Sequence, residues 1–226
     1  MRASWTRDEV ILGLDVMLSN NSKHLSMDSN AIIELSELLN RLPIIPISER
    51  NDTFRNPAGI RRQLLTFEWS LRKNDKASHV GEIFYTVYNE FNGNEAEIKC
   101  VAQAIRRNES LIRQIGFGAT EENEGFPEGA ILCHLHRYLE QQQSLRFLKD
   151  AVQCFVCGIQ PEHIYGSLPN VKFFELHLLI PPTEISSDAT FVQKDFITVC
   201  PNCHCILHQL RPWRNRKQCE DILQTL

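Results

Sequence analysis

The sequence predicts an α+β protein in which a helical N-terminal domain is followed by a small, cysteine-stapled domain. Apolar residues recur at helical spacing over the first half of the chain. Two Cys-x-x-Cys pairs, Cys154/Cys157 and Cys200/Cys203, stand in the second half, and a strand-like apolar run over 174–181 lies between them. Helices gathered in one segment and strands in another are typical of an α+β chain.

Capping patterns and apolar spacing place the helices of the first half. Thr6 and Glu9 form a capping box before the first helix. Asn56 and Pro57 supply an N-cap and a helix-compatible proline at the start of another. The later helices of this half are expected over about 29–40, 57–73, 80–91 and 95–113.

A glycine-rich, acidic stretch over 116–129 interrupts the helical pattern and predicts a linker. A long helix over about 128–151 follows it. We therefore divide the chain into a helical domain over 1–115, the linker, and a connecting helix with the cysteine-rich domain over 130–226.

Composition is that of an ordinary globular protein. The chain has 226 residues, of which 42% are hydrophobic and 23% charged, and a formal net charge of −4. The N-terminus lacks the apolar segment of a signal peptide, and no apolar stretch is long enough to span a membrane. We therefore expect a cytoplasmic protein with no membrane partner, whose cysteines do not form disulfides.

The cysteine pairs predict a structural zinc site. Zn²⁺ takes four ligands in a tetrahedron, and two Cys-x-x-Cys knuckles supply four thiolates. The expected ligands are Cys154, Cys157, Cys200 and Cys203. The remaining cysteines are expected to be ordinary thiols: Cys100, Cys133, Cys205 and Cys219.

Histidines beside these pairs predict a second metal site. His204 and His208 are four residues apart and share one face if their segment is a helix. His177 stands in the strand-like run between the pairs. Because neutral imidazoles bind divalent transition ions well, we expect these three side chains to hold one ion. The alternative is that they are additional zinc ligands or polar core residues.

A larger pattern surrounds these residues. It comprises Cys154-x-x-Cys157-Gly158, Tyr165-Gly166, Phe174-Glu175-Leu176-His177, Pro181, and Cys200-Pro201-Asn202-Cys203-His204 with His208. The pattern resembles the zinc-ribbon type of HNH endonuclease, a ββα-metal nuclease found in McrA-like modified-cytosine restriction enzymes. The segment from Trp5 to Gly59 is also similar to the helical domain that often precedes such nucleases.

The resemblance implies a ββα-metal (HNH) domain that hydrolyses DNA phosphodiesters with one Mg²⁺ or Mn²⁺, or another divalent ion, held by the three histidines. The catalytic residues that it implies are His177, Glu175, Asp195, His204 and His208, with Asp195 in the place of the family's Asn. Double-stranded DNA, including DNA with modified bases, would be the substrate of a restriction or defence enzyme. A homodimer would serve double-strand cleavage.

One position departs from the family's pattern. The family reads Glu-x-His-His-x-x-Pro, where the second His is the general base, but that position is Leu178 here. Removal of a positioned proton acceptor typically lowers a rate by about 10²–10⁴. Glu175, His163 or a re-aimed His177 are the substitute bases that the sequence leaves open. A catalytically inactive zinc-containing DNA-binding protein is the alternative function, and a zinc-stapled scaffold for a partner protein is a third.

Basic residues predict where DNA would bind. Arg55, Asn56, Arg61 and Arg62 cluster at the start of the helix that begins at Pro57, where backbone amides also attract phosphate. The alternative is a capped amphipathic helix with a solvated basic face. A second basic cluster lies over 211–217.

Overall fold

The structure, a computed structural model, describes residues 4–20, 25–73, 82–116, 128–148, 151–167 and 172–222. These residues form helices and one two-stranded antiparallel sheet, so the α+β class is confirmed. The chain divides into two compact units, Met1–Leu132 and Cys133–Leu226. Within the part of the chain that is described, no helix has the length and apolar character needed to cross a membrane.

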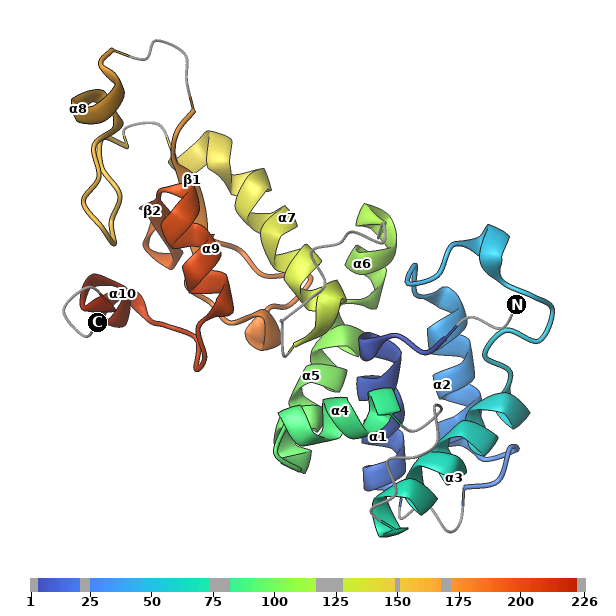
Figure 1. Ribbon diagram of the computed structural model, residues 1–226. Helices are drawn as coiled ribbons and strands as arrows, with labels where there is room; N and C mark the ends of the chain where they lie inside the picture. Colours follow the sequence, from blue (N-terminus) through green and yellow to red (C-terminus); the bar gives the residue numbers. More distant parts are fainter. Residues whose placement is uncertain are drawn as a thin grey trace. The chain divides into compact units, whose positions relative to one another are not determined.

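The first unit is built around α1 (Arg7–Ser19), which packs against α2, α3, α4 and α5 (Figure 1). Every residue from Asp8 to Met17 is buried, as is typical of a helix that other helices surround. The predicted capping box begins this helix, with the Glu9 amide donating to Thr6 Oγ1 and the Thr6 amide donating to Glu9 Oε2.

The predicted helices of the first half are confirmed, with one difference. Their bounds are α2 (Asn30–Arg41), α3 (Pro57–Lys73), α4 (Glu82–Glu90), α5 (Glu95–Arg107) and α6 (Glu109–Ile115). The single helix expected over 95–113 is wrong, because it is interrupted at Asn108. The Asn108 side chain donates a hydrogen bond to the carbonyl of Ala104 and so offers the backbone an alternative to helix continuation.

A buried carboxylate, Asp8, organises the start of α7 (Gly129–Phe147). Its oxygens accept hydrogen bonds from the backbone amides of Ala130 and Ile131, which belong to the first turn of that helix. Gly129 has a φ of +82°, and a side chain there would collide with the Asp8 carboxylate. Burial, partly offset by these two amides, raises the pKa of Asp8 to about 6.

The division between the units falls within the first turns of α7, between Leu132 and Cys133. The linker expected over 116–129 lies mostly outside the described residues, since 117–127 are not described. The long helix itself is confirmed, although α7 ends at Phe147 rather than near 151.

The second unit contains the short sheet and the helix that follows it (Figure 1). Strands β1 (Glu175–Leu178) and β2 (Phe196–Val199) pair in antiparallel register, with His177 opposite Ile197. Helix α9 (Pro201–Gln209) packs against β1. The unit also has two short helices, α8 (Pro161–Tyr165) and α10 (Arg216–Glu220), and two 3-10 turns, η4 (Pro182–Glu184) and η5 (Gln193–Asp195).

Candidate metal centres

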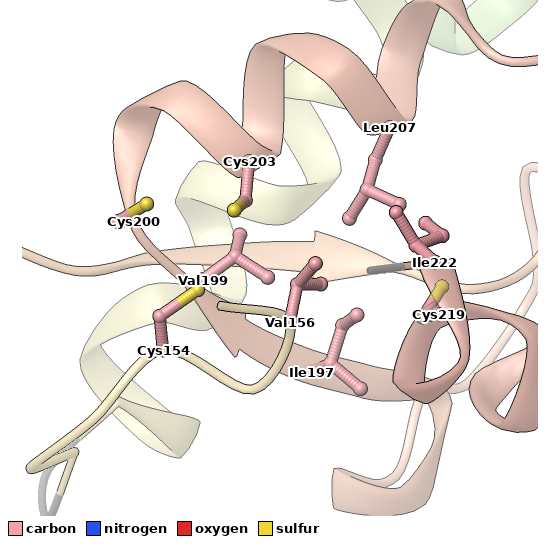
Figure 2. Packing of buried hydrophobic residues seen from close by; sticks show 9 residues of the cluster. All are labelled: Cys154, Val156, Ile197, Val199, Cys200, Cys203, Leu207, Cys219 and Ile222. Carbon is pink, nitrogen blue, oxygen red and sulfur yellow. The ribbon is translucent and has the colours of Figure 1, made fainter. Parts of the chain in front are cut away.

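Four cysteines meet in the second unit. A metal such as zinc could be held by Cys154, Cys157, Cys200 and Cys203, whose sulfur atoms all lie within 4.8 Å of one another. Three of them belong to the buried core cluster drawn in Figure 2, where Cys200 and Cys203 come from the start of α9 and Cys154 from the loop opposite. The rest of that cluster is apolar or thiol: Val156, Ile197, Val199, Leu207, Cys219 and Ile222.

Local backbone structure positions the two Cys-x-x-Cys segments so that their four sulfur atoms lie close together. In the first knuckle, the Gly158 amide donates to the Cys154 carbonyl at 2.9 Å, and the Phe155 amide donates to Thr198 of β2 at 2.8 Å. In the second knuckle, Cys200 is the N-cap of α9, and Pro201 follows it at the first helical position. Each knuckle is therefore fixed by a regular element, the first by β2 and the second by α9.

The geometry of the cysteines fits zinc. Zn–S bonds of about 2.3 Å at tetrahedral angles place the sulfurs about 3.8 Å apart. The Cys157 and Cys200 sulfurs are 3.8 Å apart, and all four cysteines are free thiols. Burial, together with contacts to Cys157 and Cys200, raises the pKa of Cys203, because thiolates so close repel one another. A divalent cation would relieve that repulsion.

A second group of metal-ligating side chains lies in the same unit. It consists of Glu140, His177, His204 and His208, whose ligand atoms also lie within 4.8 Å of one another. Glu140 comes from α7, His177 from β1, and the other two from α9, where they are one turn apart. The structure thus brings the three predicted histidines together and adds a carboxylate that sequence reasoning missed.

The separations within this group suit a single ion. His204 Nε2 and His208 Nε2 are 2.9 Å apart, and Glu140 Oε2 lies 3.1 Å from the first and 3.2 Å from the second. Around an ion with bonds of about 2.0–2.1 Å, neighbouring ligands stand about 3.0–3.4 Å apart. His177 Nδ1 is 3.4 Å from Glu140 Oε1, is buried, and makes no well-formed hydrogen bond among the described residues.

The group is shielded from solvent except at one edge. The side chains of Glu140, His177 and His208 are 3%, 1% and 2% exposed, whereas His204 is 14% exposed. Trp213 stacks on the His177 ring with centroids 5.3 Å apart. The open edge therefore lies at His204.

Burial and the carboxylate together set the charges of these histidines. Burial lowers the pKa of His177 to about 4 and that of His208 to about 3, although Glu140 acts in the opposite direction. At neutral pH both are therefore neutral and can donate a lone pair. Burial also opposes the charged form of Glu140, but the surrounding histidines outweigh it and hold its pKa well below the usual range.

His204 has a different electrostatic environment. Burial would lower its pKa, but Glu140 and Glu175 outweigh burial and raise it. Nδ1 of His204 lies 2.6 Å from Glu175 Oε2, and its Nε2 faces Glu140. The Glu175 side chain is 50% exposed and, among the described contacts, reaches the group through His204. A carboxylate on the far nitrogen of a metal-binding imidazole fixes the tautomer and orientation of the ring.

The other predicted catalytic positions lie outside the four-residue group. The Asp195 carboxylate accepts a hydrogen bond from the Val192 amide in η5, and its carbonyl accepts one from Leu179. His163 is exposed on α8. Leu178 is completely buried, and its backbone amide donates to Glu140 Oε1 at 2.9 Å.

A sequence signal for Glu140 exists, although it is weak. His136 and Glu140 stand four residues apart on α7, and His136 Nδ1 lies 3.2 Å from Glu140 Oε1. The same spacing occurs on many solvated helix faces, so it does not identify a ligand by itself. Only the packing of α7, β1 and α9 side chains around this carboxylate distinguishes it.

The residues predicted to bind DNA lie in the first unit and have different surroundings. Arg55 is 8% exposed and makes a two-point ion pair with the buried Glu9, at 2.6 and 2.8 Å. Asn56 caps α3, since its Oδ1 accepts the Gly59 amide. Arg61 and Arg62 are exposed, and the Arg61 guanidinium donates to the Leu25 carbonyl at 3.0 Å.

An open cleft of about 1050 Å³ adjoins these residues within the first unit. Its lining includes the aromatic rings of Trp5 and Phe54 and the polar side chains of Asn56, Arg62 and Gln63.

Comparison of the chain with protein-family models, with curated proteins and with solved structures gives no significant match.

Proposed function

We propose that this protein is a metal-dependent DNA endonuclease of the HNH class that acts in restriction or defence. The proposal rests on strands β1 and β2 and helix α9, which bring together His177, His204 and His208 beside a four-cysteine cluster. Two strands and a helix that hold imidazoles next to a cysteine cluster able to bind zinc provide a rigid frame for one divalent ion. We include Mg²⁺ and Mn²⁺ among the ions to be tested there.

A divalent ion in this group would stabilise negative charge on the phosphodiester oxygens. The chain's own residues would supply the orientation and the proton acceptor. His177 and His208 are buried and neutral, and so suit ligand roles. Among the substitute bases, Glu175 is favoured, because it is half exposed and lies at the open edge of the group. A re-aimed His177 is disfavoured by its burial, and His163 by its position outside the group.

DNA recognition is assigned in this proposal to the exposed part of the α3 surface. Arg61 and Arg62 are exposed there and could contact phosphates. Arg55 and Asn56 would act indirectly, since both have partners inside the unit. For each phosphate that the protein no longer touches, the slope of log K against log salt should become shallower by about 0.9. Charge reversal at Arg61 and Arg62 should therefore flatten the salt dependence of duplex binding, whereas Lys99→Glu, an exposed change on α5, should not.

A catalytically inactive zinc-containing DNA-binding protein is the second candidate. Two observations favour it: Leu178 stands at the position of the family's base, and four protein donors already face one another in the group. In that case the histidine group would stabilise the fold, and duplex binding would persist without cleavage.

Nicking of supercoiled plasmid by the full chain, in Mg²⁺ and in Mn²⁺, tests the proposal. The native protein should nick, His204→Ala should abolish nicking, and Glu175→Gln should lower the rate by about 10²–10⁴. Glu184→Gln, an exposed carboxylate on η4, is the matched control and should leave the rate unchanged. Duplex binding without nicking in either ion would favour the second candidate. Unchanged nicking by Glu175→Gln would exclude Glu175 as the base.

A further inference from the structure

Glu140 has the surroundings of a metal ligand rather than of a hydrogen-bonded structural carboxylate. Its side chain is 3% exposed. Glu140 belongs to α7 rather than to β1, β2 or α9, and it has no Lys or Arg partner among its described contacts. A buried carboxylate without a cation would face a desolvation cost of several kcal/mol. Its neighbours are imidazole nitrogens of His136, His177, His204 and His208, at 3.1–3.4 Å from its oxygens.

The two oxygens of Glu140 have different partners. Oε1 accepts the Leu178 amide at 2.9 Å, which fixes the plane of the carboxylate. Oε2 faces His204 Nε2 and His208 Nε2 at 3.1 and 3.2 Å. The Leu178 contact uses only the backbone, so it forms with any non-proline residue at position 178. Oε1 is thus held by a backbone amide and also lies 3.4 Å from His177 Nδ1, whereas Oε2 faces the two histidines of α9.

Two buried imidazole nitrogens near Glu140 make no hydrogen bond among the described residues. His136 Nε2 lies 3.1 Å from the Ile180 carbonyl, which can only accept, so this nitrogen donates a hydrogen bond. His136 Nδ1 and the buried Nδ1 of His177 lie 3.2 and 3.4 Å from Glu140 Oε1, and neither has a well-formed hydrogen bond among the described residues. A metal ion bound between Glu140 and the three histidines would give the unpartnered nitrogen of His177 a partner.

We propose that Glu140, through Oε2, is the fourth protein ligand of a second metal site with His177, His204 and His208, and that this site prefers a transition ion over Mg²⁺. Three imidazoles and one carboxylate suit Zn²⁺, Co²⁺ or Mn²⁺, whereas Mg²⁺ favours oxygen ligands and retained water. The inference rests on the histidine group of the proposed function and specifies which class of metal ion binds there. It does not require that DNA be cleaved.

Metal analysis of the full chain tests this assignment independently of nuclease activity. Native protein dialysed with Zn²⁺ should hold two equivalents, one in the four-cysteine site and one in the second site. Glu140→Gln should retain the cysteine-bound equivalent and bind the second at least tenfold more weakly. Glu184→Gln, the exposed control on η4, should retain both. The cysteine-bound ion serves as an internal measure that the unit is folded.

Cobalt spectra give a second measurement that does not depend on loss of metal. Co²⁺ bound by four thiolates gives intense charge-transfer bands, whereas Co²⁺ bound by imidazoles and a carboxylate gives only weak d–d bands. Glu140→His should keep the second ion and shift those d–d bands, because one ligand changes from oxygen to nitrogen.

Four results would overturn the assignment. They are a single metal equivalent in the native chain, unchanged affinity in Glu140→Gln, unshifted d–d bands in Glu140→His, and displacement of bound Mn²⁺ by equimolar Mg²⁺. Absence of plasmid nicking with two metals bound would count against the proposed function alone.

Discussion

The first unit packs helices around α1, in which the side chains of Val10, Ile11, Leu12 and Leu14 are fully buried. Among the described residues of the second unit, two four-residue strands and the short helix α9 lie next to the four cysteines. Both groups of side chains able to hold a metal, within the described ranges, belong to the second unit. A large apolar core stabilises the first unit, whereas the second carries both groups of side chains that could hold a metal.

Loss of the cysteine-bound metal should give the largest effect. Structural zinc contributes about 10–16 kcal/mol of apparent binding free energy to the folding of small metal domains. Cys154→Ser should therefore lose this ion and make residues beyond about 150 sensitive to protease, while Met1–Leu132 stays resistant. Elemental analysis and limited proteolysis measure both effects. Cys100→Ser, an exposed cysteine in the first unit, is the control. Equal protease sensitivity of both units would show that the first unit also depends on the cysteine-bound metal.

Removal of a buried imidazole should give the next largest effect. His208→Ala deletes a side chain that is 2% exposed and leaves the buried Glu140 carboxylate with one fewer partner. A buried group that loses a hydrogen-bond partner costs about 1–3 kcal/mol, and more when it is charged, as Glu140 is. We expect a loss of that order in the unfolding free energy, measured by urea denaturation with metal present. His163→Ala, on an exposed face of α8, should change it by less than about 0.5 kcal/mol.

Leu178 tests whether the two faces of β1 have separate roles. Side chains alternate along a strand, so Glu175 and His177 share the face that meets His204, and Leu178 points to the other. Leu178→His would bury an imidazole among apolar groups. It should cost roughly 2–4 kcal/mol of unfolding free energy without increasing plasmid nicking.

Leu178→Met keeps the volume and the apolar character of the side chain, and should cost less than about 1.5 kcal/mol. A strong gain in nicking by Leu178→His would mean that β1 presents position 178 to the metal group in solution.

Local patterns were enough to predict most of the fold and the cysteine site. The Thr6 cap, the Asn56–Pro57 start of α3 and both knuckles depend on residues within four positions of one another, and all were found. Glu140 was not predicted, because its role comes from the packing of three separate elements, α7, β1 and α9, around its carboxylate. The two-point ion pair of Arg55 was missed for the same reason, since Glu9 is 46 residues away.

Asp8 gives the smallest expected effect on stability. It is a buried carboxylate of the first unit, as Glu140 is of the second. Its pKa is raised to about 6 from 3.8, so the folded state keeps a proton that the unfolded state releases between these values. The unfolding free energy should therefore fall as pH rises from about 4 to about 6 and change little above that, by at most about 3 kcal/mol for a shift of this size. The charged neighbours Arg7 and Glu9 oppose one another in this effect. Asp8→Asn should remove that part of the slope in urea unfolding at a series of pH values, whereas the exposed Asp28→Asn should not. A slope that survives Asp8→Asn would assign the pH dependence to other groups, and the histidine group around Glu140 would be the first to examine.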